Sequence, residues 1–339
     1  MMRSTQPFLR KLGPMLIAVL AVTVFWSCQR QDTEDGEKKV WKLSMIKYDE
    51  LRQTRDSEAG FQSGLAAAGL KEGVDYTIVT RNAQGDADAV LSLIDATAAD
   101  GTDMIISLQT PTLHTAVQRG EGLPLVYMVV ANPFVISTVG RNDKEHLPYL
   151  TGVYTNTTFT SMLEYIKQVM PNVRRIGTLF AQSELNATFY KSQLIEAASA
   201  AGLQLETYGV SYKSSVPQAT QSLVDLGIDA ICQIEDNMTS ATFPSIIKVA
   251  KENKIPVFSF VDEQAQQGSV IVVAPDYIQG AMTAAGLAAR IIRGEKPADS
   301  PFTKIQKFNH IVNLRAAHEA GLNIPQSILD RADNVLNDE

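Results

Sequence analysis

The feature that most constrains the fold is a regular alternation of short apolar runs with longer segments. From residue 41 onward, runs of four to six residues are apolar nearly throughout. Such runs are typical of strands buried on both faces of a parallel sheet. The segments between them are long enough for covering helices, which predicts an α/β protein with doubly wound parallel sheets. The predicted strands are 41–46, 76–80, 104–107, 125–129, 151–154, 176–180, 205–210, 230–234, 257–260 and 270–273.

The two halves of the chain also resemble each other. Three segments of the first half return in the second half, in the same order and about 130 residues later. They are Ala67-Ala-Gly-Leu70 with Ala200-Ala-Gly-Leu203, Gly101–Ile106 with Gly227–Cys232, and Leu123–Tyr127 with Ile255–Phe258. Any two doubly wound domains share turns of this kind, for example a glycine that ends a helix. Three matches in one order nevertheless favour two related lobes.

Length and charge limit the function. The 339 residues fit two domains of ordinary size, and 45% hydrophobic content is enough for two cores. A formal net charge of −7 argues against a nucleic-acid partner, because the surface would repel phosphate. The four histidines, His114, His146, His310 and His318, lack the spacing of a metal site. No catalytic or cofactor motif is found, so we expect neither an enzyme nor a cofactor.

The N-terminus predicts export and anchoring. Arg3, Arg10 and Lys11 precede an uncharged stretch, residues 12–27, that suits a signal peptide better than a membrane span. The small residue Ser27 followed by Cys28 resembles a bacterial lipoprotein signal, which implies lipidation of Cys28 and attachment to the membrane. Residues 1–27 would be the signal peptide and residues 28–39 a solvated tether. The alternative is an uncleaved anchor with a chance cysteine, and both place the body outside the cytoplasm, in the cell envelope.

The polar loops after the predicted strands are the candidate ligand site. Ligands of open parallel sheets bind beyond the carboxyl ends of the strands. The loops 107–111 and 130–133 follow two strands of the first half, and 233–237 and 261–264 are their counterparts. We predict that these loops and the residues near them line one crevice between the lobes. The predicted site residues are Tyr48, Gln109, Thr110, Asn132, Tyr154, Ser183, Glu184, Asn186, Asp236, Asn237, Phe260, Asp262, Asp276 and Tyr277.

The chemistry of these residues suits a carboxylate, an ammonium group or hydroxyl groups of a small ligand. Thr110, before Pro111 at a helix start, could hold a carboxylate with its hydroxyl and with free backbone N–H groups. The carboxylates of Glu235, Asp236, Asp262 and Glu263 could hold an ammonium or hydroxyl groups, and aromatic rings near the strand ends could stack on a ring. For any one of these side chains, core packing or a loop cap is an equal alternative. Asp236 and Asn237 could instead cap the following helix.

An ordered series of short segments resembles the substrate-binding proteins of a bacterial ABC-transporter family that includes tryptophan and tyrosine binders. The resemblance runs from about residue 42 to residue 337. Its landmarks include Gln84-Gly85, Thr110-Pro111, Asn132-Pro133, Ser183-Glu184, Asn186, Asp236-Asn237, Pro275-Asp-Tyr277, Val312-Asn-Leu314 and Ala316-Ala317. The family's usual Asp-Pro is Asn132-Pro133 here, and its usual Asn-Ser is Asn186-Ala187, so the ligand can differ from aromatic amino acids.

The resemblance implies a type I periplasmic-binding fold: two parallel-sheet lobes joined by a three-crossing hinge. The crossings are expected near residues 148–153, 271–277 and 303–312. Residues 40–150 with 275–303 would form the N-terminal lobe, and residues 151–272 with 310–339 the C-terminal lobe. A helix over 276–293 would return to the first lobe.

The predicted function is that of a monomeric, extracytoplasmic solute-binding lipoprotein of an ABC importer. It would close its two lobes on a small-molecule ligand, an amino acid with aromatic ones among the candidates, and deliver it to a membrane permease. The main alternative is a ligand-sensing module that presents its closed form to a signalling receptor. A purely structural surface lipoprotein is a third reading, and it predicts no thermal shift with any small molecule.

Overall fold

The computed structural model describes residues 1, 39–119, 122–155, 157 and 159–337. Cys28, the predicted signal peptide and nearly all of the predicted tether lie outside the described residues. Residues 1–39 and 40–339 form separate units, and the second unit holds both sheets. Within the described residues, no helix combines the length and the apolar character that crossing a membrane requires.

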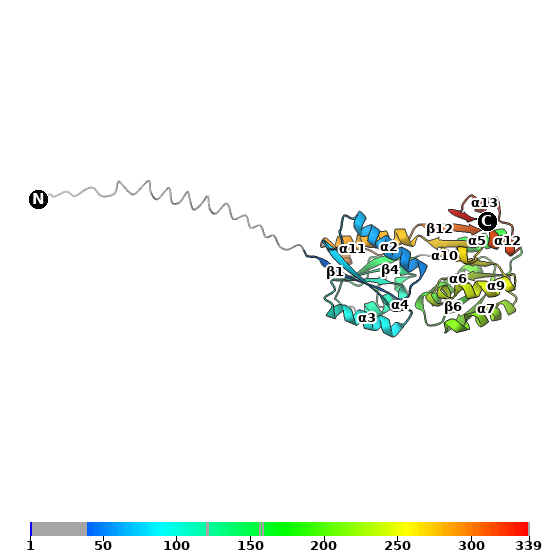
Figure 1. Cartoon of the computed structure of the whole chain (residues 1–339), viewed down its shortest axis with the longest axis horizontal. Helices are drawn as coiled ribbons and strands as arrows, with labels where there is room; N and C mark the ends of the chain where they lie inside the picture. The colour runs from blue at the N-terminus through cyan, green and yellow to red at the C-terminus, as the bar shows by residue number, and fades with distance from the viewer. Residues whose placement is uncertain (2–38, 120–121, 156, 158, 338–339) are drawn as a thin grey trace. The chain divides into compact units, whose positions relative to one another are not determined.

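The first sheet has six parallel strands in the order β11-β5-β4-β3-β1-β2 (Figure 1). We call this sheet and the helices packed on it the N-terminal lobe. Its strands are β1 (Trp41–Lys47), β2 (Tyr76–Asn82), β3 (Met104–Leu108), β4 (Leu125–Val130), β5 (Leu150–Tyr154) and β11 (Thr303–Lys304). The apolar runs predict β1, β3, β4 and β5 well because both faces of these strands are covered, whereas β2, at the edge of the sheet, is partly exposed.

Helices cover both faces of this sheet. The helices α2 (Arg52–Ala67) and α11 (Tyr277–Ile292) cover one face, and α3 (Ala87–Ala99) and α4 (Thr110–Arg119) cover the other. Side chains of one strand therefore alternate between two cores. In β3, Met104 and Ile106 pack with α2 and α11, whereas Ile105 packs with α3 and α4. Two 3₁₀ turns, Pro133–Val135 and Pro297–Asp299, complete the lobe.

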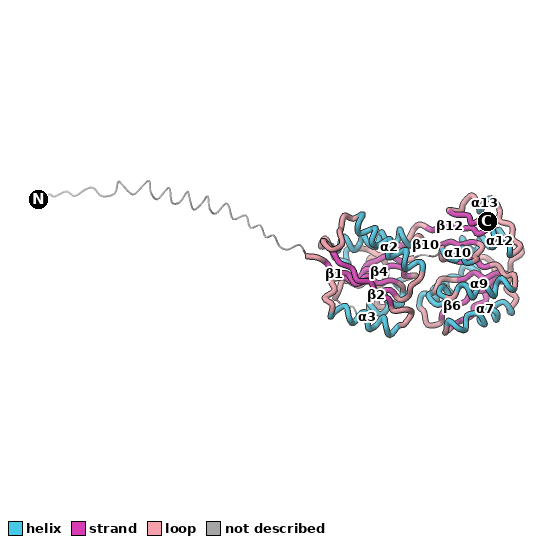
Figure 2. The backbone as a smooth tube through the Cα atoms, viewed as in Figure 1, coloured by secondary structure: helices cyan, strands magenta, loops and turns pink. Residues whose placement is uncertain are grey.

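The second sheet has seven strands in the order β13-β12-β10-β9-β8-β6-β7. This sheet and its helices form the C-terminal lobe. Its strands are β6 (Arg175–Ala181), β7 (Gln204–Val210), β8 (Ala230–Gln233), β9 (Val257–Ser259), β10 (Ile271–Pro275), β12 (Phe308–Asn313) and β13 (Asn334–Leu336). All neighbours are parallel except β10 and β12, which are antiparallel. The secondary-structure view in Figure 2 shows the strands of each lobe between its helices.

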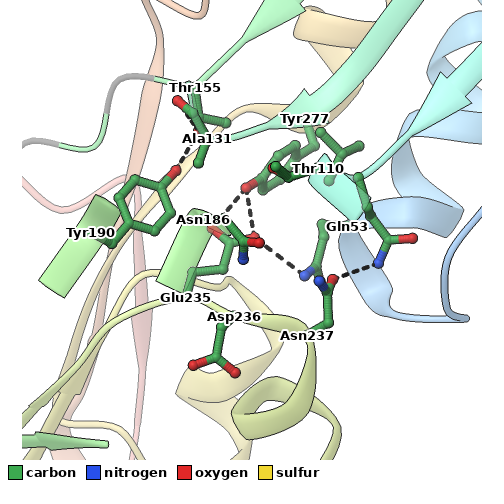
Figure 3. Close-up of a pocket in the computed structure, with 12 residues that line it drawn as sticks. Gln53, Thr110, Ala131, Thr155, Asn186, Tyr190, Glu235, Asp236, Asn237 and Tyr277 are labelled. Carbon is green, nitrogen blue, oxygen red and sulfur yellow. Dashed lines mark hydrogen bonds between the residues drawn. The ribbon is translucent and has the colours of Figure 1, made fainter. Parts of the chain in front are cut away.

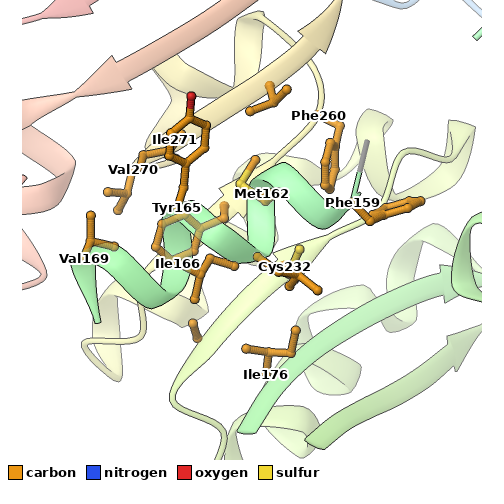
Figure 4. Packing of buried hydrophobic residues seen from close by; sticks show 14 of the residues in the cluster. Phe159, Met162, Tyr165, Ile166, Val169, Ile176, Cys232, Phe260, Val270 and Ile271 are labelled. Carbon is orange, nitrogen blue, oxygen red and sulfur yellow. The ribbon is translucent and has the colours of Figure 1, made fainter. Parts of the chain in front are cut away.

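The C-terminal lobe repeats the same layering. One face carries α5 (Phe159–Val169), α6 (Leu185–Ala200) and α12 (Leu314–Glu319), and the other carries α7 (Val216–Asp225) and α9 (Phe243–Glu252). Figure 4 shows the first of these cores, where Met162 and Ile166 of α5 pack over Cys232 of β8. The remaining elements are α8 (Asn237–Ala241), α10 (Glu263–Gln267), α13 (Gln326–Leu329) and the 3₁₀ turn Lys213–Ser215.

The chain passes between the two sheets three times: after β5, after β10 and after β11. The second and third passages fall within the ranges expected from the sequence, 271–277 and 303–312. The predicted boundary after residue 150 is wrong, because residues 150–154 form β5, which pairs with β4 and belongs to the N-terminal lobe. A strand and its pairing partner share one sheet, so the first crossing follows Tyr154 instead of lying at 148–153.

Helix α11 returns to the N-terminal lobe and packs closely against α2. The contact is made by small residues: a Cβ on Gly64 would lie 2.6 Å from the Ala285 Cβ and 2.8 Å from the Met282 Cα. A Cβ on Gly60 would lie 2.5 Å from the carbonyl oxygen of Ile278. This packing brings the first residues of both helices, Gln53 and Tyr277, to the same edge of the lobe.

Candidate ligand-binding site

Residues from the carboxyl-end loops of both sheets line one small cavity between the lobes, here called the inner cavity (Figure 3). Its volume is about 20 Å³, which is enough for a water molecule. The lining residues are Gln53, Gln109, Thr110, Val129, Ala131, Thr155, Asn186, Tyr190, Glu235, Asp236, Asn237 and Tyr277. Most of them are polar and buried, so their hydrogen bonds decide what the cavity can bind.

Glu235 connects the two lobes. It follows β8 of the C-terminal lobe and accepts hydrogen bonds from the Tyr277 hydroxyl at 2.7 and 2.8 Å and from the Gln53 side chain at 3.2 Å, both in the N-terminal lobe. Burial raises the pKa of Glu235 to about 7, against the lowering effect of the Tyr277 hydrogen bond, and the nearby Asp262 carboxylate raises it further. No cation balances this carboxylate among the residues that line the inner cavity.

Gln109 makes a second contact between the lobes. Its Nε2 donates to Asn237 Oδ1 at 2.7 Å, and its Oε1 accepts from the backbone N–H groups of Tyr48 and Asp49. The backbone of Gln109 has a φ of 72°, which a residue other than glycine rarely adopts. The two backbone N–H groups that donate to Oε1 hold the Gln109 side chain in place for its contact with Asn237.

Two carboxylates hold the start of α8. Glu184 accepts from the backbone N–H groups of Asn237 and Met238, and Asp236 accepts from the backbone N–H groups of Thr239 and Ala181. The predicted N-cap role of Asp236 is therefore present in the structure. Burial raises the pKa of both carboxyl groups, and the Glu184 carboxylate also raises the pKa of Asp236. Their oxygens are engaged with the backbone, which leaves Glu235 as the more available carboxylate.

Asn186 presents an oxygen without a partner. Its Nδ2 donates to Glu184 Oε2 at 3.1 Å, and a carboxylate can only accept, so the amide nitrogen must face Glu184. Its Oδ1 is buried and has no hydrogen-bond partner among the described residues. The side chain lines the inner cavity, so this oxygen is available to a donor there.

An outer cavity of about 310 Å³ adjoins the inner one and shares Ala131, Thr155 and Tyr190 with it. The Tyr190 hydroxyl and the Thr155 hydroxyl are hydrogen-bonded to each other where the two cavities meet. Aromatic rings form much of the outer wall, and Lys304 is the one charged residue of that lining, 5.7 Å from the centre of the Tyr154 ring. The full lining is Ala131, Asn132, Phe134, Tyr154, Thr155, Thr157, Phe159, Phe189, Tyr190, Gln193 and Lys304.

A third cavity, of about 30 Å³, lies on the other side of Gln53 and Tyr277, which line both it and the inner cavity. Its acidic residues are Asp56, Asp262 and Asp276, and its one cation, Arg52, is paired with Asp56 at 2.8 Å. Burial raises the pKa of Asp262, and the hydrogen bond from Asn309 only partly offsets this effect. Among the described residues, no group of three or more His, Cys, Asp or Glu side chains is placed to hold a metal ion.

The predicted site residues are distributed over these cavities. Gln109, Thr110, Asn186, Asp236, Asn237 and Tyr277 line the inner cavity, Asn132 and Tyr154 line the outer one, and Asp262 and Asp276 line the third. Four others line none of the three. Tyr48 and Glu184 touch residues that do, Ser183 is exposed, and Phe260 is fully buried in the core, 5.0 Å from Phe159 between ring centres.

Sequence reasoning missed several lining residues. Tyr190 lies four residues after Asn186 on α6, and this spacing places both on one helix face, a signal that could have been used. Thr155 follows β5, which was predicted to lie in the C-terminal lobe but pairs with β4 of the N-terminal lobe. The sequence indicated Glu235 as one of several carboxylates after the strands, without placing it among the predicted site residues. Gln53 carries no local signal, since only the packing of α2 on α11 brings it to Glu235.

Two parallel-sheet lobes, three passages between them and a polar cavity at facing strand ends define a protein that binds a small ligand between its lobes. The family model of the ABC transporter substrate binding proteins matches residues 42–336, so this chain belongs to that family. A tyrosine-binding protein of Clostridioides difficile is 26% identical over 313 residues, 90% of each chain.

Solved structures share the fold. An ABC domain in complex with L-Trp from Streptococcus pneumonia has 24% identity and a TM-score of 0.84, covering 88% of this chain and 100% of that one. A ligand-free, open substrate-binding protein with adhesive properties from Clostridium difficile has 25% identity and a TM-score of 0.68 at the same coverage. Sugar-binding and inositol-binding proteins are also structurally similar to this chain, at lower identity. The chain therefore has the type I periplasmic-binding fold.

Proposed function

We propose that this chain is the extracytoplasmic solute-binding lipoprotein of an ABC importer and that its ligand is an amino acid, aromatic ones included. The observation that carries the proposal is the inner cavity, where polar side chains of both lobes meet and hydrogen-bond across the crevice. A ligand that replaces or adds to these bonds holds the lobes together. This is the differential contact that favours the closed form of a hinge protein.

The cavities suit an amino acid with a ring. The inner cavity offers carboxylate, amide and hydroxyl groups for the polar end of the ligand. The outer cavity, with the rings of Phe134, Tyr154, Phe159, Phe189 and Tyr190, offers an apolar wall for its side chain. The tyrosine-binding relative and the L-Trp complex support this choice of ligand. The inner cavity is too small for an amino acid in this arrangement, so binding requires the lobes to separate slightly.

The partners follow from the family and from the N-terminus. A substrate-binding protein of an ABC transporter delivers its ligand to a membrane permease, and the predicted lipid on Cys28 would keep it near that permease. The predicted tether, residues 28–39, would link the body to this anchor. We further propose that the body acts as a monomer and as a binding protein without catalytic activity.

A thermal-shift screen of the purified chain against amino acids, nucleosides and sugars tests the proposal, with calorimetry on each hit. Binding only to the folded state raises the melting temperature as ligand concentration rises. We expect the largest shift with an aromatic amino acid. Binding of a sugar alone would contradict the proposed ligand class, and the absence of a shift with every compound would contradict solute binding.

Cys28→Ser should release the chain from the membrane fraction if the anchor is correct.

A further inference from the structure

The charges that line the inner cavity are all of one sign. Glu235 and Asp236 are its ionisable carboxyl groups, and no Lys, Arg or His belongs to its lining. The nearest cations in the neighbouring cavities have other contacts, since Arg52 pairs with Asp56 and Lys304 lies over the Tyr154 ring. A buried carboxylate without a cation is unfavourable, and a cationic group of a ligand relieves this cost.

The inner cavity also contains a hydrogen-bond acceptor, Asn186 Oδ1, that has no donor in the described part of the chain. Glu184 fixes the amide nitrogen of Asn186, so the unpartnered Asn186 Oδ1 is the atom left for the cavity. Glu235 and Asn186 both line this small space, as Figure 3 shows. Two acceptors on one cavity wall, one of them charged, match a group that carries several N–H donors and a positive charge. A primary ammonium group has this chemistry.

We propose that the crevice selects its ligand by a protonated primary amine, which lies between the Glu235 carboxylate and the Asn186 side-chain oxygen. This inference rests on the proposed function and names the group that the site recognises. The amine forms hydrogen bonds to Asn186 Oδ1 and to Glu235, while Tyr277 and Gln53 keep their bonds to Glu235. A ligand carboxylate finds only neutral donors in the inner cavity, such as Thr110, and is repelled by the acidic side chains. The amine is therefore required, and the carboxylate contributes less.

Matched sets of compounds separate the two groups. Each set has an amino acid, the amine that lacks its carboxylate, and the acid that lacks its amine. The sets are L-tyrosine, tyramine and hydroxyphenylpropionate; L-tryptophan, tryptamine and indolepropionate; and L-leucine, isoamylamine and isocaproate. Calorimetry on the purified chain should show that loss of the amine weakens binding about 100-fold or more, and that loss of the carboxylate weakens it less than this.

Two variants locate the amine. Glu235→Gln keeps an acceptor for Tyr277 but removes the charge. It should weaken binding of the amino acid and the amine about ten-fold or more, while the acid binds as well as before or more tightly. Asn186→Ala should weaken the same two compounds. Because each comparison is a ratio of affinities on one variant, reduced stability does not imitate the result. Glu319→Gln is the matched control, since it removes an exposed carboxylate of the same lobe that pairs with Lys251.

The outcomes distinguish this inference from the proposed function. If an acid binds as tightly as its amino acid, or Glu235→Gln leaves the ratio unchanged, the inference is wrong and solute binding stands. Binding of none of the nine compounds, together with binding of a sugar or nucleoside, overturns both the inference and the proposed amino-acid ligand class, while solute binding stands. If no small molecule binds at all, the proposed function fails and the inference fails with it.

Discussion

At the residue scale, Glu235 has surroundings that differ strongly from water. It is buried, it accepts hydrogen bonds only from the neutral groups of Tyr277 and Gln53, and its pKa is raised to about 7. Between about pH 4.3 and pH 7, the ligand-free folded protein therefore holds a proton on Glu235 that the unfolded chain has released. This difference links the stability of the fold to pH.

The stability contribution of Glu235 is fully present below its unfolded pKa and is lost as the pH rises through about 7. We expect the free energy of unfolding of the ligand-free protein, relative to Glu235→Gln, to fall by about 2 kcal/mol between pH 5.5 and pH 8. Urea unfolding of both proteins at the two pH values measures this. The comparison with the variant removes the contributions of Asp236, Glu184 and Asp262, whose pKa values are also raised. A constant difference would show that Glu235 stays ionised throughout.

At the element scale, the packing of α2 on α11 determines where the donors to Glu235 lie. Gln53 is the second residue of α2 and Tyr277 is the first residue of α11, so both side chains stand at helix starts beside the crevice. The helices can approach closely because Gly60 and Gly64 of α2 face Ala281 and Ala285 of α11. A larger residue at this contact would shift both helix starts.

We predict that Gly64→Ala destabilises the fold by about 1–3 kcal/mol, because the added Cβ would clash with backbone atoms of Met282 and with the Ala285 side chain. Thermal or urea unfolding measures the change. Gly286→Ala is the control: it lies on α11 with nothing within 4 Å of an added Cβ, and it should stabilise the helix by about 0.5–1 kcal/mol. Equal effects of the two substitutions would contradict the close contact.

Sequence patterns located some elements better than others. Most strands from β1 to β10 follow apolar runs because they are covered on both faces, whereas the edge strands β2 and β7 are partly exposed. The strand β12 was not predicted, since Phe308–Asn313 mixes polar and apolar residues and is only half-buried at its start. β11 has two residues and β13 three, too few to give a periodic signal. Their pairing with β5 and β12 comes from tertiary structure alone.

At the scale of the whole molecule, a small number of polar contacts joins the lobes at the crevice. Besides Glu235 with Tyr277 and Gln109 with Asn237, Lys213 lies 3.4 Å from Asp49 and Arg55 lies 3.8 Å from Glu263. The last two pairs are exposed, and exposed pairs contribute little. The buried hydrogen bonds to Glu235 and Asn237 therefore favour this arrangement without ligand more than the exposed pairs do.

Tyr277→Phe removes one of these bonds without changing the shape of the ring. We predict that the ligand-free variant has a larger radius of gyration by small-angle X-ray scattering than the unsubstituted chain, and that saturating ligand restores the smaller value. Ligand affinity should fall several-fold, because the lost Tyr277–Glu235 bond also holds the lobes together around the ligand. Tyr165→Phe is the control, since its hydroxyl bonds His310 within the C-terminal lobe. An unchanged radius in both variants would argue against a role for the Glu235–Tyr277 bond in closure.

The sequence by itself determined the α/β class, the two related lobes and the polar loops at the strand ends. These are local consequences: a buried strand needs an apolar run, and a helix start needs a cap such as Asp236. Only the tertiary structure decided that β5 belongs to the first sheet and that Gln53, Glu235 and Tyr277 meet. Strand pairing and helix packing join residues far apart in the chain, and the energies that select them come from contacts that no local pattern contains.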